Sequence, residues 1–267
     1  MRITVNGKEI ETNCNTIYEL CEYLGKLKDV VIINGYQTSE NCTLSEQDVV
    51  FVIEKGVMPE QNDLESMMAA RHTPQVHARA KAAKVAIAGL GGLGSNIAVV
   101  LARTGVGSLL LVDFDIVEPS NLNRQNYHID HLGLPKTVAL QKQIRKINPF
   151  IKVKIKTVRV EEANIPELFA GYDVVCEAFD NPEAKAMLVN TVLEQLPGVK
   201  IVAASGMAGY ASSNLIRTEQ RLKNLYICGD SENAARIGNG LMAPRVQICA
   251  GHQANMVLRL LLGIEEV

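Results

Sequence analysis

The sequence lacks the features that point to a membrane or to nucleic acid. No apolar run in its 267 residues reaches the roughly 18 that a membrane-spanning helix needs. The formal net charge is −2, so there is no basic field to attract nucleic acid. Residues 1–7 alternate like a β-strand and do not resemble a secretory signal peptide. We therefore expect a cytoplasmic protein that binds neither membranes nor nucleic acid.

Cysteine pairs with metal-ligand spacing are also missing. The cysteines are Cys14, Cys21, Cys42, Cys176, Cys228 and Cys249. None belongs to a Cys-x-x-Cys motif, so a cysteine zinc site has no local support. Free thiols are typical of a reducing cytoplasm.

What the sequence does contain is a glycine-rich turn between an apolar strand, residues 85–88, and an apolar helix. The spacing Gly89-x-Gly91-x-x-Gly94 matches the dinucleotide-binding fingerprint. In that fingerprint the first glycine allows a tight turn, the second lets a phosphate approach, and the third lets helix and strand pack closely. The helix N-terminus adds unpaired N–H groups for an anion. We predict nucleotide binding here; the alternative is a turn that only serves close packing.

Polar residues follow the next apolar strand, residues 108–112. Asp113 follows this strand directly. Its separation in sequence from the glycines is that of the fingerprint's acidic residue, which binds a ribose hydroxyl. The later segment Ser-Asn-Leu-Asn-Arg-Gln belongs at the carboxyl edge of the sheet, where open α/β sheets bind ligands. Within it, Arg124 offers a bidentate phosphate contact, and Asn121 and Gln125 offer neutral hydrogen bonds. The alternative is an ordinary polar loop.

Two further charged residues stand where predicted elements meet. Lys136 opens a helix, where a lysine opposes the helix dipole unless a phosphate binds nearby; the alternative is a solvated surface lysine. Asp180 ends another strand, just before Asn181 and Pro182 begin a helix. It is either a helix cap or a ligand of Mg²⁺, which prefers carboxylate oxygens together with substrate phosphates. These charges favour a triphosphate-and-metal site over a nicotinamide site.

The first sixty residues predict a separate α+β domain. Its expected elements are strands at 2–5 and 8–12, a helix at 16–24, and strands at 30–33 and 48–53. A polar linker and a helical stretch, interrupted near Pro74, lead to the glycine-rich strand. We predict a small domain at 1–58, a linker and helical segment at 59–84, and a nucleotide-binding domain at 85–267. The last is expected to be α/β, with a Rossmann-like, mostly parallel sheet and helices on both faces.

The carboxyl-terminal third predicts fewer regular elements. Residues 213–217 are expected to form a strand, and residues 218–242, which are polar and rich in glycine, an irregular crossing segment. A final helix is expected from Pro244 to about Leu262.

The first domain resembles the ThiS-like β-grasp (ubiquitin-like) sulfur carriers of thiamine biosynthesis over residues 1–53. The resemblance implies the carriers' fold, but those proteins react through a free Gly-Gly carboxyl end. Here the last strand runs on through the single glycine Gly56 to Pro59. We expect a domain with the shape of a carrier and no reactive end, acting in docking or regulation; the alternative is a stabilising appendage.

The second domain resembles the ThiF/MoeB/HesA family, the bacterial relatives of ubiquitin-activating enzymes, over about residues 69–263. The motifs that carry the resemblance are the glycine turn, Asp113-Phe-Asp115, Ser120-Asn-Leu-Asn-Arg-Gln125, Pro135-Lys136 and Asp180-Asn181. The resemblance implies an adenylyltransferase that uses ATP and Mg²⁺. Its partner would be a ubiquitin-like sulfur carrier ending in Gly-Gly, and the enzyme would be a homodimer.

The patterns and the resemblance together propose a set of site residues. Those assigned to nucleotide binding are Gly89, Gly91, Gly92, Gly94, Asp113, Asn121 and Gln125. Those assigned to catalysis are Arg124, Lys136, Asp180 and Arg71. The resemblance makes Asp180 the Mg²⁺ ligand and matches Arg71 to an arginine that relatives lend across the dimer.

The sequence departs from the family in its cysteines. Many relatives hold a structural zinc between two Cys-x-x-Cys pairs, which are absent here, so we expect no zinc. Some relatives add a cysteine that takes the carrier covalently. Cys228, expected in a glycine-flanked loop, is the candidate, whereas Cys249 fits a buried helix position. Lys185 stands where family members usually carry arginine.

The predicted function is ATP-dependent adenylation of the C-terminal glycine of a sulfur carrier. Thiamine (thiazole) biosynthesis is favoured because the first domain resembles thiamine carriers. One alternative is a non-catalytic nucleotide-binding scaffold, autoinhibited by its own β-grasp domain. Others are a relative that activates a molybdopterin or cysteine carrier, or a tRNA, and a nicotinamide dehydrogenase.

Overall fold

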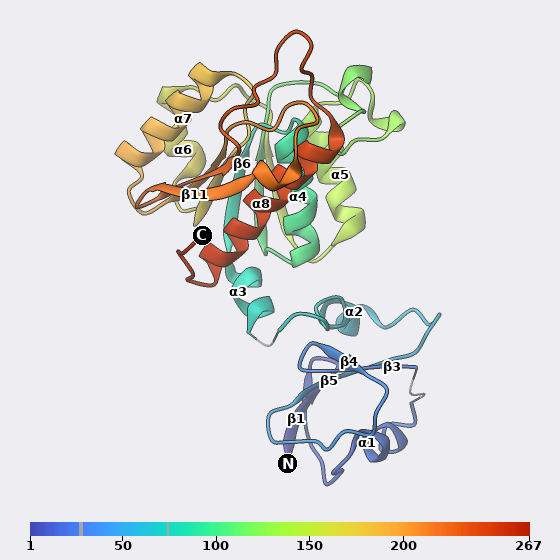
Figure 1. Ribbon diagram of the computed structural model, residues 1–267. Helices are drawn as coiled ribbons and strands as arrows, with labels where there is room; N and C mark the ends of the chain where they lie inside the picture. The colour runs from blue at the N-terminus through green and yellow to red at the C-terminus, as the bar shows by residue number, and fades with distance from the viewer. Residues whose placement is uncertain (27–28, 74) are drawn as a thin grey trace. The chain divides into compact units, whose positions relative to one another are not determined.

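The computed structural model describes residues 1–26, 29–73 and 75–267 (Figure 1). The chain divides into two compact units, Met1–Ala78 and Arg79–Val267. Pro74, where the sequence predicts a break in a helix, lies outside the described residues. Across the described ranges, no helix combines the length and the apolar character that crossing a membrane requires.

The first unit is a mixed sheet with two helices. Its elements are β1 (Arg2–Val5), β2 (Lys8–Glu11), α1 (Ile17–Tyr23), β3 (Val30–Ile33), β4 (Tyr36–Thr38), β5 (Val49–Ile53) and α2 (Gln61–Met68). The strand order is β2-β1-β5-β3-β4, with β1 and β5 parallel and the other neighbours antiparallel. The predicted small α+β domain is confirmed.

Local signals explain the turns of this unit. Asn6–Gly7 joins β1 to β2 and Asn34–Gly35 joins β3 to β4, and all four residues have positive φ, as a type I′ hairpin turn requires. Thr16 caps helix α1: its side chain accepts a hydrogen bond from the backbone N–H of Glu19. The prediction missed β4, because three residues are too few to show the alternation of a strand.

Both faces of the small sheet are covered within the unit. Alternate residues of the strands pack on one side against α1. On the other side, Ile32 and Phe51 pack with Ala70, just beyond α2. The Ser66 hydroxyl of α2 also donates to the carbonyl of Asn6 at 3.0 Å. The segment after the last strand therefore folds back on its own sheet.

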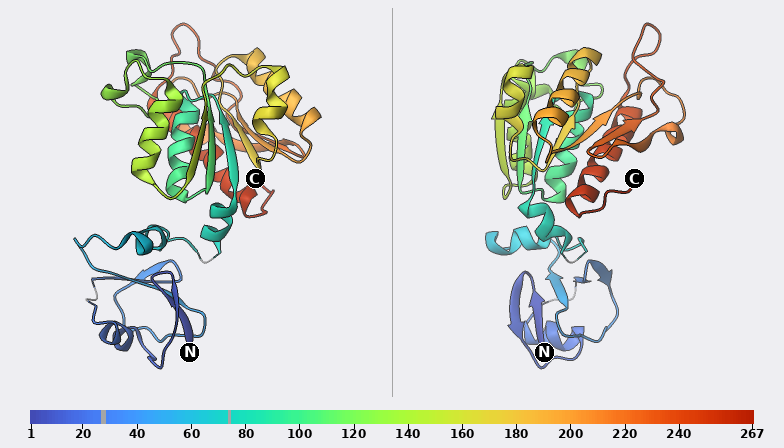
Figure 2. Two further views of the ribbon diagram at one scale, coloured as in Figure 1. Left: turned by 180° about the vertical axis from the view of Figure 1, so that it is seen from behind. Right: turned by 90° about the vertical axis from the view of Figure 1, so that its left-hand side faces the viewer.

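The second unit is a seven-stranded sheet with helices on both faces (Figure 1 and Figure 2). Its strands are β6 (Lys84–Ala88), β7 (Ser108–Val112), β8 (Lys152–Lys156), β9 (Val174–Glu177), β10 (Lys200–Ala204), β11 (Arg217–Leu222) and β12 (Leu225–Gly229). Its helices are α4 (Gly92–Thr104), α5 (Lys136–Ile147), α6 (Ile165–Phe169), α7 (Pro182–Gln195) and α8 (Ala243–Leu261), and α3 (Val76–Ala82) contains the point where the units divide.

The strand order of this sheet is β11-β12-β10-β9-β6-β7-β8, and only β11 runs antiparallel to its neighbour. Alternate residues of β6 point to opposite cores. Val85 and Ile87 belong to the core built with α4, α5 and α8, whereas Ala86 and Ala88 belong to the core built with α6 and α7. The predicted Rossmann-like, mostly parallel sheet is confirmed.

The carboxyl-terminal third differs from its predicted course. Where a strand was expected, Ser213–Leu215 forms a short 3₁₀ turn, and the expected irregular segment contains β11 and β12. Strand β12 lies between β10 and β11, so both of its edges are hydrogen-bonded. Its identity as a strand comes from these long-range pairings, which the polar flanking sequence does not reveal.

The packing of α4 on β6 leaves no room for a side chain at Gly94. A Cβ there would lie 1.8 Å from the carbonyl oxygen of Gly89. Gly251, in the middle of α8, has no atom within 4 Å of the corresponding position. The two glycines are thus a matched pair, one required by packing and one not.

We expect Gly94→Ala to destabilise the protein by about 3 kcal/mol, because the added methyl group forces strand and helix apart. Gly251→Ala should stabilise it by roughly 0.5–1 kcal/mol, since alanine is the better helix former. Thermal unfolding of both variants measures the difference. Equal melting temperatures would contradict the close packing.

Candidate functional site

The glycine turn is held by the carboxylate at the end of the neighbouring strand. Gly89 has φ +89°, and the N–H of Leu90 donates to Asp113 Oδ2 at 2.6 Å. The other oxygen, Oδ1, accepts the N–H of Asp115 at 2.8 Å. Burial raises the pKa of the Asp113 carboxyl, while these two N–H groups oppose the rise. Sequence reasoning had not foreseen this: Asp113 shapes the turn as well as facing the predicted nucleotide site.

The Ser-Asn-Leu-Asn-Arg-Gln segment is hydrogen-bonded to the same turn. Asn96, in the first turns of α4, donates through Nδ2 to the carbonyls of Gly92, at 2.7 Å, and Arg124, at 3.1 Å. The Tyr127 hydroxyl donates to the carbonyl of Leu90 at 2.8 Å. The segment therefore packs on the glycine turn, and its assignment to a nucleotide site stays a prediction. Sequence reasoning missed Asn96 and Tyr127, although Asn96 lies only two residues after the last glycine of the motif.

The two predicted amides of this segment have different surroundings. Asn121 is buried, and its side-chain oxygen accepts the N–H of Glu118 at 3.0 Å, so it shapes the short 3₁₀ turn Pro119–Asn121. Gln125 is also buried and lies beside Gly91, with Nε2 3.9 Å from the position of a Cβ there. Its Oε1 has no hydrogen-bond partner among the described residues. A buried amide with an unused acceptor is suited to a polar ligand at the turn.

Arg124 lies against Gly92, with Cγ 3.5 Å from the position of a Cβ on that glycine. Its Nη1 donates to neutral acceptors, the Ser120 carbonyl at 3.1 Å and the Asn123 side chain at 2.9 Å. Its buried Nε has no partner, and in the described part of the chain no carboxylate pairs with the guanidinium. The turn thus carries an uncompensated positive charge.

Lys136 is buried at the start of α5, so the alternative of a solvated surface lysine is wrong. Its Nζ lies 3.0 Å from Asp115 Oδ2, and its backbone N–H donates to the Asp115 carbonyl at 2.9 Å. The side chain of Asp115 is about half exposed. Lys136 therefore reaches the acidic end of β7 from the neighbouring helix.

Asp180 is exposed on the turn between β9 and α7. It is not the helix cap, because Asn181 accepts the N–H of Ala184 at 2.9 Å. A Cβ on Gly89 would lie 2.9 Å from the carbonyl oxygen of Ala178, so this turn packs directly on the glycine turn. No described residue forms a hydrogen bond or ion pair with the Asp180 carboxylate. An exposed carboxylate at this edge fits the oxygen chemistry of Mg²⁺.

Arg71 belongs to the first unit, where its guanidinium donates to the side-chain oxygen of Gln37. The other predicted site residues all belong to the second unit, at the carboxyl edge of the larger sheet. A role for Arg71 in catalysis stays a prediction.

Cys228 does not lie in a loop, as the sequence suggested, but in the buried strand β12. Burial raises the pKa of its thiol to about 11, only partly opposed by a hydrogen bond with Thr218. Its carbonyl accepts the thiol of Cys249 at 3.5 Å. The expected burial of Cys249 is confirmed. Neither thiol has the exposure that a covalent acceptor needs.

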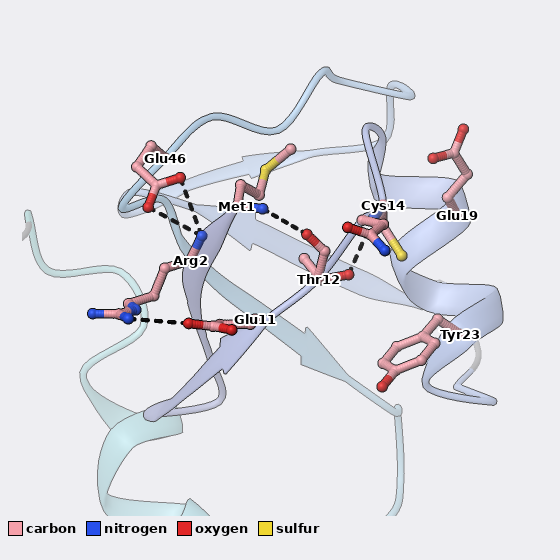
Figure 3. Close-up of a pocket in the computed structure, with 9 residues that line it drawn as sticks. Met1, Arg2, Glu11, Thr12, Cys14, Glu19, Tyr23 and Glu46 are labelled. Carbon is pink, nitrogen blue, oxygen red and sulfur yellow. Dashed lines mark hydrogen bonds and ion pairs between the residues drawn. The ribbon is translucent and has the colours of Figure 1, made fainter.

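A hollow in the first unit does not offer comparable chemistry (Figure 3). Its polar groups largely satisfy one another. The amino terminus of Met1 donates to Thr12, Arg2 pairs with Glu11 at 3.0 Å, and Glu46 accepts the N–H of Arg2. The candidate site is therefore the edge of the larger sheet.

Family models match both parts of the chain. The ThiS-like ubiquitin model matches residues 1–56, and the ThiF family model matches residues 65–267. The chain belongs to the ThiF family. This membership agrees with the order of the glycine turn, the polar segment and the acidic strand ends.

Several curated relatives share this ThiF family region. The molybdopterin-synthase adenylyltransferase of Escherichia coli K12 is 32% identical over 189 residues, 68% of this chain and 74% of the relative. The SAMP-activating enzyme E1 of Haloferax volcanii is 40% identical over 116 residues, 43% of each chain. Adenylyltransferase and sulfurtransferase UBA4 of Yarrowia lipolytica is 29% identical over 193 residues, 68% of this chain and 46% of the relative. The chain spans about half the length of most of these relatives.

Solved structures share the ThiF family fold. The E. coli tRNA N6-threonylcarbamoyladenosine dehydratase TcdA, in complex with ATP, has a TM-score of 0.68 at 22% identity, covering 78% of this chain and 98% of that one. E. coli MccB with ATP has a TM-score of 0.58 at 21% identity, covering 79% and 74%.

We expect iodoacetamide near pH 8 to label Cys14 and Cys42, which are partly exposed, and to spare Cys228. With a pKa of about 11, roughly one Cys228 thiol in a thousand is ionised at that pH, and the thiolate is the reactive form. Peptide mass spectrometry measures the labelling, and the urea-unfolded chain is the control in which every cysteine reacts. Rapid labelling of Cys228 in the folded protein would contradict its burial.

Proposed function

We propose that this protein adenylates the C-terminal glycine of a ubiquitin-like sulfur-carrier protein, using ATP and Mg²⁺, in thiamine (thiazole) biosynthesis. The observation that carries the proposal is the charge around the glycine turn. Arg124 has no carboxylate partner, Lys136 is buried at the same edge, and Asp180 is exposed beside them. A nicotinamide needs none of these charges, whereas a triphosphate with its metal uses all three. Relatives named adenylyltransferase, and similar solved structures that contain ATP, support the proposal of an ATP-dependent adenylyltransferase.

In this proposal the glycine turn binds the phosphates. The N–H groups of Gly91, the N-cap residue, and Gly92, the first residue of α4, have no partner within the helix and provide donors for an anion. Asp113 keeps lone pairs beyond those used by Leu90 and Asp115, and these accept from a ribose hydroxyl. ATP therefore lies across the carboxyl ends of β6 and β7.

Asp180 would hold the Mg²⁺ ion through its exposed carboxylate. Bound there, the ion would offset negative charge on the phosphate oxygens. Asp180 suits this role because it is not used as a helix cap.

The chemical step needs no nucleophile from the protein. A carboxylate oxygen of the carrier attacks the α-phosphorus of ATP, the bond from that phosphorus to the β-bridging oxygen breaks, and pyrophosphate leaves with its electron pair. Arg124 and Lys136 stabilise the charge that develops on the phosphates. Catalysis is then mainly positioning and electrostatics, which agrees with the burial of Cys228.

The carrier in this proposal is a separate protein, and the first unit is an accessory. Strand β5 leads to α2 rather than to a reactive end, and α2 covers a face of the small sheet. The match of residues 1–56 to ThiS-like ubiquitin favours a thiamine carrier. The second candidate is a carrier of another pathway, because one relative is named for molybdopterin synthase.

ATP–pyrophosphate exchange tests the proposal. We expect exchange that depends on Mg²⁺ and on a separate carrier ending in Gly-Gly, and that is faster with a thiamine carrier than with a molybdopterin carrier. Asp180→Asn should lower it by about a hundredfold or more, as loss of one preorganised electrostatic group does. Glu183→Gln, at a neighbouring exposed acid, is the matched control and should change it little. ATP binding without exchange by any carrier would favour the scaffold.

Active-site complementation tests the proposed homodimer and the lent arginine. Arg71→Ala and Asp180→Asn should each be inactive alone. If Arg71 acts in the partner's site, mixing and re-pairing the two variants should restore about one quarter of the sites. Exchange assays before and after mixing measure this. A mixture as inactive as its parts would contradict action of Arg71 in the partner's site, and a fully active Arg71→Ala variant would remove Arg71 from the mechanism.

A further inference from the structure

An ion pair with a buried carboxylate lies directly behind the turn that carries Asp180. Glu177, the last residue of β9, is 1% exposed. Both of its carboxylate oxygens lie 3.0 Å from Nζ of Lys185, on α7. One of them also accepts the N–H of Phe179 at 2.6 Å. The carboxylate thus holds the backbone of the residue immediately before Asp180.

Lys185 is fully used by these contacts. Besides the two Glu177 oxygens, its Nζ donates to the carbonyl of Ala204, at the end of β10, at 3.1 Å. An ammonium group has three donors, so none is left for a phosphate. The side chain is only 24% exposed. Lys185 is therefore placed to hold protein groups and not to bind the nucleotide directly.

The turn is held at its other end as well. Asn181 caps α7, and its carbonyl accepts the N–H of Lys185 at 3.0 Å. Gln253, from α8, donates to the carbonyls of Glu177 and Val202, both at 3.1 Å, and so joins the ends of β9 and β10. Between these fixed points only the Asp180 side chain is exposed and without a partner in the described chain.

We propose that Glu177 and Lys185 are positioning residues that hold Asp180 in place and thereby set the affinity of the site for its divalent cation. The inference rests on the proposed function, in which Asp180 is the cation ligand. Residues that orient a metal ligand without touching the metal typically change metal affinity by about 10- to 100-fold when they are replaced. The pair is expected to act on the cation and not on ATP itself.

Mn²⁺, which is visible by electron paramagnetic resonance, is the probe. For Lys185→Met we expect Mn²⁺ affinity of the protein–ATP complex to fall about tenfold or more, and ATP affinity in EDTA to stay within about twofold. Lys185→Arg should restore most of the Mn²⁺ affinity, because arginine also donates to Glu177 and Ala204. Lys200→Met is the matched control, since Lys200 also pairs with a glutamate, Glu265, but at the opposite end of β10.

Unchanged Mn²⁺ affinity in folded Lys185→Met would overturn the proposal. So would an equal loss of ATP affinity in EDTA, because that result makes Lys185 a phosphate ligand. Should Lys185→Met not fold, Glu177→Gln combined with Lys185→Met removes the buried charge and is titrated in its place. If Lys185→Met binds Mn²⁺ more weakly but the unaltered protein shows no carrier-dependent exchange, the positioning role stands and the adenylyltransferase proposal fails. If the unaltered protein shows exchange but Lys185→Met binds Mn²⁺ normally, the adenylyltransferase proposal stands and the positioning role fails.

Discussion

The close approach of α4 to the end of β6 is the constraint on which the site depends. Position 94 has no room for a Cβ, and Gly89 must take a positive φ to begin the turn. Asp113 then holds the turn from the neighbouring strand. Because the turn is fixed by packing and by a buried carboxylate, its N–H groups face the sheet edge before any ligand arrives. Such preorganisation lowers the entropic cost of binding.

Charged groups at this edge fall into two classes. Glu177 with Lys185, and the buried pair of Asp230 with Arg245, satisfy each other and hold backbone segments. Arg124 and Asp180 have no charged partner in the described chain. Buried pairs of this kind suit a role in specifying geometry, and unpaired charges suit a ligand. The division separates two pairs that build the site from Arg124 and Asp180, which we propose to bind ATP and its metal. Lys136 belongs to neither class, because it is proposed to act on the phosphates and also pairs with the half-exposed Asp115.

The first unit has the strand order of a β-grasp domain but uses its surface differently from a free carrier. Ile32 and Phe51 would form an apolar strip on the outer face of the sheet, and Ala70 and α2 cover it. In a free carrier the chain after the last strand forms the reactive carboxyl end, whereas here the chain after β5 forms α2 and covers the apolar strip. An accessory domain with both faces occupied is consistent with a carrier that comes from a separate protein.

The sequence alone determined the features that local physics decides. The glycine spacing, the Asn-Gly turns and the order of strands and helices up to β10, apart from the short β4 and α6, depend on neighbouring residues and were readable. The family resemblance likewise rested on short motifs in order, and it proposed a group of residues that the structure places at the carboxyl edge of the larger sheet.

Only the tertiary structure decided what depends on distant contacts. Lys136 is buried next to Asp115, whose carboxylate forms an ion pair with its ammonium group. Cys228 lies in a strand because β12 pairs with both β10 and β11. The hydrogen bond from the N–H of Leu90 to the Asp113 carboxylate joins residues 23 positions apart. Such contacts cost chain entropy and form only when the whole sheet assembles, so no local pattern records them.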